Sequence, residues 1–196
     1  MLNVVLVQPE IPANTGNVGR TCVLAGARLH LVGPFGFDLS DMAVRRAGLA
    51  YWHSLDLVVH ANWDAFVRDA LGVELGTPLP SGTHLLTKIG ARTYDQAAYH
   101  DGDWLVFGRE SAGLDQQLIA ANPDRCERIP MVGDEALVDA DRWHVRHDEL
   151  HPELRRDICG NFVDPREGQI SSLNLSNAVA IVLFEALRQQ GFPGLR

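Results

Sequence analysis

No stretch of this sequence is long and apolar enough to cross a membrane. A membrane-spanning helix needs about 18 apolar residues in a row, whereas the run "AVAIVLF" at residues 178–184 ends after seven. A basic region followed by a long apolar stretch is also missing at the N-terminus, so no signal peptide is visible. We therefore expect a cytoplasmic protein without a membrane partner.

Cysteine and lysine are scarce. Cys22, Cys126 and Cys159 are an odd number without close pairing, which favours free thiols in a reducing compartment. A zinc site of four thiolates is excluded within one chain. Lys88 is the only lysine, against 16 arginines. The guanidinium fork suits phosphate and carboxylate, although such a skew also follows from genomic composition alone.

Two glycine signatures of nucleotide-binding proteins are absent. The sequence has no G-x-G-x-x-G after a strand and no G-x-x-x-x-G-K-[ST], so a dinucleotide fold or a P-loop enzyme would lack its usual phosphate cradle. The net charge of −8 argues at first sight against nucleic acid, since phosphate contacts need positive groups. However, residues 132–170 hold ten acidic residues against five arginines, so the rest of the chain is closer to balance.

Short apolar runs alternate with helix-like stretches over the 196 residues, a length that suits one sizeable domain. Such alternation implies crossover connections, and hence a mostly parallel α/β sheet with helices on both faces. The clearest helix begins at Leu175, because apolar residues recur at helical spacing up to Ala186 before Gly191 ends the pattern. The predicted strands are residues 2–7, 29–32, 55–60, 84–87, 104–107 and 128–131, and the other predicted helices are about 15–26, 40–48, 62–71 and 114–121.

The loop "QPEIPANTGNVGR" follows the first predicted strand, and ligands of open α/β sheets bind in such loops. Its prolines stiffen it, and Asn14 or Thr15 can cap the next helix. Gly16 and Gly19 permit the close approach of another backbone or a ligand. Arg20 would lie about one turn into that helix. A capped helix with a surface arginine explains the loop about as well as a binding site does.

Two later strand ends carry similar polar clusters. "VFGRESAGL" places Gly108, Arg109 and Glu110 where a strand gives way to a helix. "SSLNLSNA" opens the final helix with serines and asparagines, which are more polar side chains than one helix cap uses. This surplus favours a binding site at these ends.

These motifs resemble a known family. The segments "MLNVVLVQPEIPANTGNVGRTC", "RLHLVGPFGF", "RRAGLAYW", "DGDWLVFGRESAGL", "RIPM" and "SLNLSNAVAIVLFEALRQQGFPG" together resemble the TrmL-type tRNA 2′-O-methyltransferases of the SPOUT superfamily. The resemblance implies one methyltransferase domain over residues 1–196, with an insertion at about 132–170. It also implies a parallel sheet whose C-terminal segment forms a deep trefoil knot, which spacing alone does not predict because connections are generally unknotted.

The resemblance further implies a cofactor, an assembly and a substrate. Family members bind S-adenosylmethionine in the knot, act as homodimers, and methylate the ribose 2′-oxygen of the wobble nucleotide in certain tRNAs. A metal is not needed, since the positive charge of the donor already activates its methyl group. The matching cofactor positions in this sequence are Leu85, Gly108, Ile129 and Ser172.

Arg20 falls on the catalytic arginine of the family. That arginine is usually described as the group that activates the 2′-hydroxyl, yet arginine hardly ever loses its proton in a protein. We therefore expect Arg20 to orient the ribose or its phosphate and to stabilise negative charge that develops on oxygen. The first loop would hold the nucleotide, and catalysis would arise mainly from proximity and orientation.

An acidic protein needs a local basic face to bind tRNA, and a homodimer would double its extent. The candidates for this face are Arg20, Arg45, Arg46, Lys88, Arg92 and Arg109. Arg45 and Arg46 also fit a solvated helix face. The strand-end residues Asn14, Glu110 and Asn177 are further candidates for tRNA binding.

Residues 132–170 depart from the family pattern, in which "RIPM" passes to "SLNLSN" after a handful of residues. Because the segment leaves from one cofactor position and returns at another, we expect it beside the methyl donor, as a lid or as an added RNA or dimer contact. It contains a metal-like cluster of His144, His147 and His151, with Cys159 nearby. Charged segments produce such spacing by chance, so we interpret the cluster as solvated surface and expect no metal.

Two alternatives to the wobble methyltransferase stay open. One is an RNA-binding protein that keeps the fold but has little activity, because the inserted segment blocks the cofactor. The other is a methyltransferase that acts on another RNA site. A nucleotide-dependent oxidoreductase suits the alternating elements but lacks its glycine signature.

Overall fold

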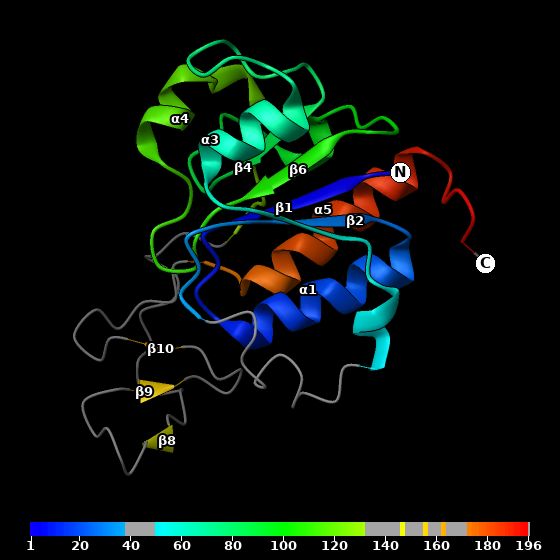
Figure 1. Cartoon of the computed structure of the whole chain (residues 1–196), viewed down its shortest axis with the longest axis vertical. Coiled ribbons are helices and arrows are strands. Elements are labelled where there is room, and N and C mark those ends of the chain that lie inside the picture. The colour runs from blue at the N-terminus through cyan, green and yellow to red at the C-terminus, as the bar shows by residue number, and fades with distance from the viewer. Residues whose placement is uncertain (38–49, 132–145, 148–154, 157–161, 164–171, 196) are drawn as a thin grey trace. The chain divides into compact units, whose positions relative to one another are not determined.

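The structure is a computed structural model, and it describes residues 1–37, 50–131, 146–147, 155–156, 162–163 and 172–195 (Figure 1). The chain divides into two compact units. The first unit is Met1–Ile129 with Leu175–Arg196, and the second unit is Pro130–Asn174. The interpretation of residues 132–170 as an insertion into a single domain stays a proposal.

Seven strands form one sheet in the first unit, in the order β3-β2-β1-β6-β4-β7-β5, and every neighbouring pair is parallel. This confirms the predicted parallel α/β sheet. The strands are β1 (Asn3–Val7), β2 (Arg28–Val32), β3 (Leu57–His60), β4 (Thr83–Leu86), β5 (Arg92–Thr93), β6 (Trp104–Phe107) and β7 (Cys126–Arg128). The second unit has three short antiparallel strands, β8 (Arg146–His147), β9 (Arg155–Arg156) and β10 (Phe162–Val163).

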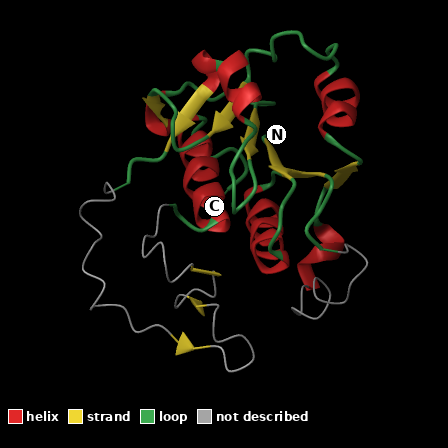
Figure 2. Cartoon of the chain, turned by 90° about the vertical axis from the view of Figure 1, so that its left-hand side faces the viewer, coloured by secondary structure: helices red, strands yellow, loops and turns green. Residues whose placement is uncertain are grey.

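Two long helices lie side by side on one face of the sheet, α1 (Pro12–Ala25) and α5 (Leu175–Gln189) (Figures 1 and 2). The opposite face carries shorter helices, which the chain forms between later strands. These are α3 (Trp63–Phe66), the π-helix η2 (Val67–Leu71) and α4 (Gln116–Ala121). The described residues of the first unit also form the 3-10 helices η1 (Ala50–Ser54), η3 (Tyr94–Gln96) and η4 (Pro123–Arg125).

The central strands β2, β1, β6 and β4 are buried on both faces, as expected for parallel strands. Successive side chains of a strand point to opposite faces, so Val4 joins the apolar cluster under α1 and α5, whereas Val5 joins the cluster with Phe66 on the other side. The two predicted free thiols that lie in described residues, Cys22 and Cys126, are both buried. Burial raises the pKa of the Cys22 thiol to about 12, which leaves it unreactive.

Some element boundaries differ from the predictions. The predicted strand at 128–131 is wrong, because β7 spans Cys126–Arg128 and ends before Pro130. Proline has no N–H to donate to a strand ladder, so the apolar residues of "RIPM" do not continue the strand. The first helix begins at Pro12 rather than near residue 15. The predicted helix at 40–48 lies outside the described residues. The knot predicted for the C-terminal segment stays a prediction.

Candidate active site

The loops that follow β1 and β6 are neighbours, because these two strands pair directly in the sheet. The loop after β6 turns back on itself, since Arg109 and Gly113 exchange two backbone hydrogen bonds of 3.1 and 2.8 Å. Gly108 makes this turn possible, because a Cβ at this position would lie 2.1 Å from the carbonyl carbon of Gly113. Any other residue at position 108 would therefore push the loop open.

Two carboxylates join these loops reciprocally. Glu110 accepts the backbone N–H groups of Glu10 at 2.8 Å and Ile11 at 3.3 Å, and the side-chain amide of Asn14 at 3.1 Å. Glu10 in turn accepts the backbone N–H of Ser111 at 2.9 Å and its hydroxyl at 2.8 Å. The two strand-end loops are thus held together by five hydrogen bonds, all of them accepted by these two carboxylates.

The contact with Glu110 places a negative charge at the N-terminus of α1. The residue before the helix is Ile11, whose side chain cannot cap, and the first turn contains no acidic residue. A carboxylate near a helix N-terminus is stabilising, because the exposed N–H groups carry partial positive charge, and Glu110 fills this place. The prediction that Asn14 or Thr15 caps the helix is wrong, since both are buried inside its first turn.

Arg20 lies about two turns into α1, not one, because the helix begins earlier than predicted. Its side chain is exposed. The helix face before it is covered by η1, where the Tyr51 hydroxyl donates a 2.6 Å hydrogen bond to the carbonyl of Gly16. At Gly19 the predicted close approach is made by Trp52 and Leu55, which belong to the same chain.

The predicted cofactor positions reach one edge of the sheet from three adjacent strands. Leu85 on β4 pairs with Val106 of β6 and with Cys126 of β7. Gly108 and Ile129 follow shortly after these partners. The side chain of Leu85 is fully buried in the core. Only its backbone could therefore contact a cofactor. Ser172 is exposed and belongs to the second unit.

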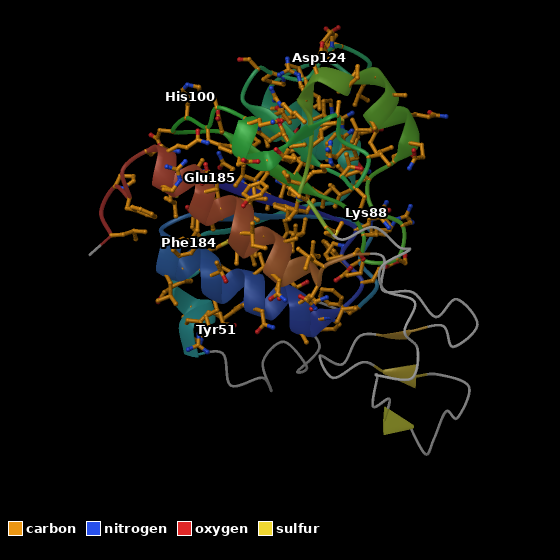
Figure 3. The ribbon with its side chains drawn as sticks, turned by 180° about the vertical axis from the view of Figure 1, so that it is seen from behind. Tyr51, Lys88, His100, Asp124, Phe184 and Glu185 are labelled. Atoms are coloured by element: carbon orange, nitrogen blue, oxygen red, sulfur yellow. The ribbon has the colours of Figure 1, made fainter. Side chains whose placement is uncertain are left out.

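The predicted tRNA-binding residues have different environments. Arg109, Lys88 and Asn177 are exposed; Figure 3 shows Lys88 on the outer surface. Asn14 and Glu110 contact each other and hold the two loops. Arg45 and Arg46 lie outside the described residues, and so do most of the residues of the histidine cluster.

Arg92, another of the predicted basic residues, contacts a buried acidic partner. Its guanidinium contacts the carboxylate of Glu127 at 2.5 and 3.2 Å, and Glu127 is fully buried. The same carboxylate faces His84 Nδ1 at 3.1 Å, and His84 Nε2 faces Asp103 at 3.2 Å. Arg92 therefore compensates a buried charge, which the sequence did not reveal because the partner lies 35 residues away.

A second buried polar pair lies on the opposite face of the sheet. His30 Nδ1 and His60 Nε2 are 3.0 Å apart, within an aromatic surround of Phe66 and Trp104. Burial, reinforced by the charge of the neighbouring histidine, lowers the pKa of His30 to about 4. A neutral pair is favoured, in which one ring donates and the other accepts. This pair belongs to the core and not to the strand-end loops.

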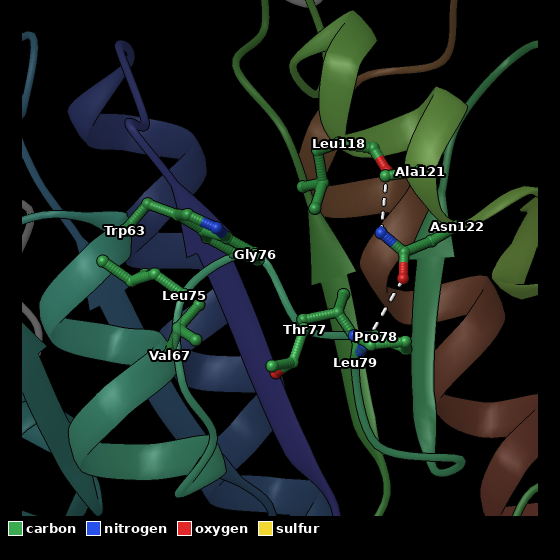
Figure 4. A pocket seen from close by; sticks show the side chains of 10 residues that line it. All are labelled: Trp63, Val67, Leu75, Gly76, Thr77, Pro78, Leu79, Leu118, Ala121 and Asn122. Carbon is green, nitrogen blue, oxygen red and sulfur yellow. Dashed lines mark hydrogen bonds between the residues drawn. The ribbon is translucent and has the colours of Figure 1, made fainter.

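One pocket of about 190 Å³ lies away from these loops, beside α3 and α4 (Figure 4). Its one side-chain amide, that of Asn122, bonds the carbonyl of Leu118 at 3.0 Å and the N–H of Leu79 at 3.4 Å. The amide is therefore already bonded to backbone groups of the protein itself. The remaining lining is largely apolar and comprises Trp63, Val67, Leu75, Gly76, Thr77, Pro78 and Ala121.

Among the described residues, no three histidine, cysteine or acidic side chains are grouped so as to hold a metal ion. No helix in the same part of the chain has the length and apolar character of a membrane span.

Comparisons with known proteins identify the family. The profile of the SpoU rRNA Methylase family matches residues 1–136. A tRNA (cytidine(34)-2'-O)-methyltransferase of Burkholderia cenocepacia (strain HI2424) is 40% identical over 195 residues, which cover 99% of this chain and 99% of that protein. A solved structure described as "Structural insights into the 2-OH methylation of C/U34 on tRNA" has a TM-score of 0.70 and 33% identity, over 97% of both chains.

A third similar protein is the AdoMet-bound rRNA methyltransferase from Sinorhizobium meliloti, with a TM-score of 0.63 and 26% identity over 95% of this chain and 56% of its own. The fold is thus that of the RNA methyltransferase class. The chain belongs to the SpoU rRNA Methylase family. The resemblance to TrmL-type enzymes is confirmed by these relatives.

Proposed function

We propose that this chain is an S-adenosylmethionine-dependent methyltransferase that modifies the ribose 2′-oxygen of the wobble pyrimidine in tRNA. The observation that carries the proposal is the match, over nearly the full length of both chains, to a protein named for 2′-O-methylation of cytidine 34 in tRNA. A solved structure of similar coverage concerns the same position, with either pyrimidine. A cytoplasmic location accords with this substrate.

The cofactor would bind where β6, β4 and β7 end. These strands are adjacent although they are not consecutive in the chain. Leu85 lies on β4, and Gly108 and Ile129 directly follow its two neighbours, β6 and β7. Ligands of α/β sheets bind beyond the carboxyl ends of strands, where loop backbones supply donors and acceptors. Ser172 stays a fourth predicted cofactor position, and it belongs to the second unit. When bound, S-adenosylmethionine supplies a methyl group that its sulfonium charge has already activated.

Arg20 would act on the ribose. Its guanidinium is exposed on α1, and it carries five N–H donors in a fixed geometry. We assign it to orient the ribose or its phosphate and to donate hydrogen bonds to the 2′-oxygen as negative charge develops there. Glu110 supports this role indirectly, because its hydrogen bonds fix the start of α1.

The chain would act as a homodimer. Leu24 on α1 is 69% exposed and Phe184 on α5 is 44% exposed, and these two helices contact each other. Figure 3 shows Phe184 pointing outward from α5. Large apolar side chains on adjacent helices are typical of a surface that a partner covers. A second copy would cover this surface and double the basic face for tRNA, formed by Arg20, Lys88 and Arg109 together with Arg45 and Arg46.

Two measurements test the proposed function. Mass-spectrometric mapping of tRNA from cells with and without the gene should show ribose methylation at a wobble pyrimidine only in the first sample, and identical maps would contradict the proposal. Calorimetry with S-adenosylmethionine should show binding by the purified protein. Binding without transfer to any tRNA would favour another RNA acceptor, and no binding would favour an RNA-binding protein without activity.

A further inference from the structure

Tyr51 and Trp52 pack η1 across the middle of α1. The Tyr51 hydroxyl donates to the Gly16 carbonyl at 2.6 Å, and Figure 3 shows Tyr51 beside this helix. One turn further on, a Cβ at Gly19 would lie only 3.1 Å from a ring carbon of Trp52. The absence of a side chain at Gly19 therefore lets the indole lie against the helix next to Arg20.

The Gly16 carbonyl has a second role. In an α-helix the N–H of each residue donates to the carbonyl four residues earlier, so the Gly16 carbonyl is the acceptor for the backbone N–H of Arg20. Since a carbonyl oxygen has two lone pairs, the Tyr51 hydroxyl and the Arg20 N–H can share it. The Tyr51 hydroxyl thus bonds the same carbonyl that holds the backbone of Arg20 in the helix.

The electrostatics agree with this placement. Burial raises the pKa of the Tyr51 phenol, and the nearby positive charge of Arg20 lowers it by a smaller amount. Tyr51 is therefore a neutral hydrogen-bond donor at the pH of ordinary assays, and it lies within the electrostatic range of Arg20.

We propose that Tyr51 is a positioning residue for methyl transfer: its hydrogen bond to Gly16, with Trp52 packed on Gly19, fixes the turn of α1 that presents Arg20 to the ribose. The inference rests on the proposed function. It predicts that Tyr51 affects the transfer step and not the binding of cofactor or tRNA, because Tyr51 acts through the orientation of Arg20.

The test compares Tyr51→Phe with Tyr99→Phe in the full-length protein. Both changes remove one hydroxyl that donates to a backbone carbonyl, since Tyr99 donates to the carbonyl of Tyr94, at the start of η3, at 2.8 Å. Single-turnover methyl transfer, with saturating S-adenosylmethionine and tRNA, should slow about tenfold in Tyr51→Phe and less than twofold in Tyr99→Phe. Dissociation constants for both ligands should stay within twofold of wild type in each variant.

A double-mutant cycle separates positioning from a general structural effect. In an Arg20→Ala background there is no guanidinium to orient, so adding Tyr51→Phe should leave the residual rate unchanged. A further tenfold loss in that background would overturn the inference, and so would equal rates for Tyr51→Phe and wild type. If Arg20→Ala is too slow to measure, the comparison with Tyr99→Phe decides.

The outcomes also separate this inference from the proposed function. A wild-type protein that methylates no tRNA would contradict the proposed function itself. An active wild type whose rate is unaffected by Tyr51→Phe would contradict only the role of Tyr51.

Discussion

The side-chain amide of Asn14 donates a 3.1 Å hydrogen bond to the carboxylate of Glu110, across 96 residues of sequence. The bond forms because β1 and β6 are neighbours, so the loop before α1 meets the loop after β6. The same carboxylate accepts the backbone N–H groups of Glu10 and Ile11. One acidic side chain therefore fixes the N-terminus of α1 against the Gly108 turn, and this sets the position from which Arg20 projects.

The first prediction concerns this carboxylate. Glu110→Gln replaces one acceptor oxygen by an NH₂ group that faces N–H donors, and it removes the charge near the helix N-terminus. We expect the free energy of unfolding to fall by about 1–2 kcal/mol and single-turnover methyl transfer to slow. Urea unfolding and transfer assays measure the two effects. Glu74→Gln, at an exposed position after η2, is the control and should change neither.

The second prediction concerns pH. The pKa of His30 is about 4 in the folded chain, below the unfolded value of about 6.5. Between these values the unfolded chain binds a proton that the folded chain does not, so stability is fully present above pH 6.5 and falls toward pH 4. The loss should approach roughly 3 kcal/mol at pH 4.

Urea unfolding at several pH values between 7.5 and 4 measures this loss. His30→Leu should show a smaller decrease over the same window. His53→Gln, which changes an exposed histidine, should follow the wild-type curve. A wild-type free energy of unfolding that stays flat from pH 7 to 4.5 would contradict the assignment of a neutral histidine pair.

The sequence predicted where the strands lie along the chain better than it predicted their order in the sheet. Apolar runs such as "WLVF" mark β6 at its observed bounds, because parallel strands buried on both faces are continuously apolar. The order β6-β4-β7 could not be predicted, since no local pattern specifies which distant strands pair. The reciprocal contacts of Glu10 and Glu110 depend on that order, and they were missed for the same reason.

The roles of individual polar residues were the least predictable. Arg92 resembles any other arginine in the sequence, and only the fold shows that the carboxylate of Glu127 is buried beside it. Tyr51 belongs to the segment "RRAGLAYW" that suggested the family, but its contact with Gly16 needs the three-dimensional path of η1. The glycines of α1 were the one feature of the sequence that pointed to this contact. They predicted that something lies close to the helix, but not that it is η1.

The third prediction concerns the dimer. Phe184→Glu places a charge on the exposed apolar surface of α5, so a homodimer that uses this surface should dissociate. Sedimentation velocity should show a shift from dimer to monomer at micromolar concentration. Leu75→Glu is a matched control, because Leu75 is 47% exposed and lies beside the pocket at α3 and α4. Dissociation by both variants, or by neither, would contradict an interface at Phe184.

The last prediction separates structural from RNA-binding arginines. Arg92→Ala leaves the fully buried carboxylate of Glu127 without its guanidinium partner, although His84 still faces it. Removing one partner of a buried ion pair costs about 3–5 kcal/mol, and because the Arg92 side chain is 42% exposed we expect a smaller loss, of about 1–3 kcal/mol. Arg28→Ala breaks the surface pair with Asp56 and should cost less than about 1 kcal/mol.

Urea unfolding measures both losses, and tRNA binding at several salt concentrations supplies the second readout. Each phosphate contact that is removed lowers the salt dependence of binding. Arg92→Ala should leave this slope unchanged, because its guanidinium is engaged by Glu127, whereas Arg109→Ala, on the exposed loop after β6, should reduce it. A reduced slope in Arg92→Ala with unchanged stability would show that Arg92 contacts RNA and would contradict its structural assignment.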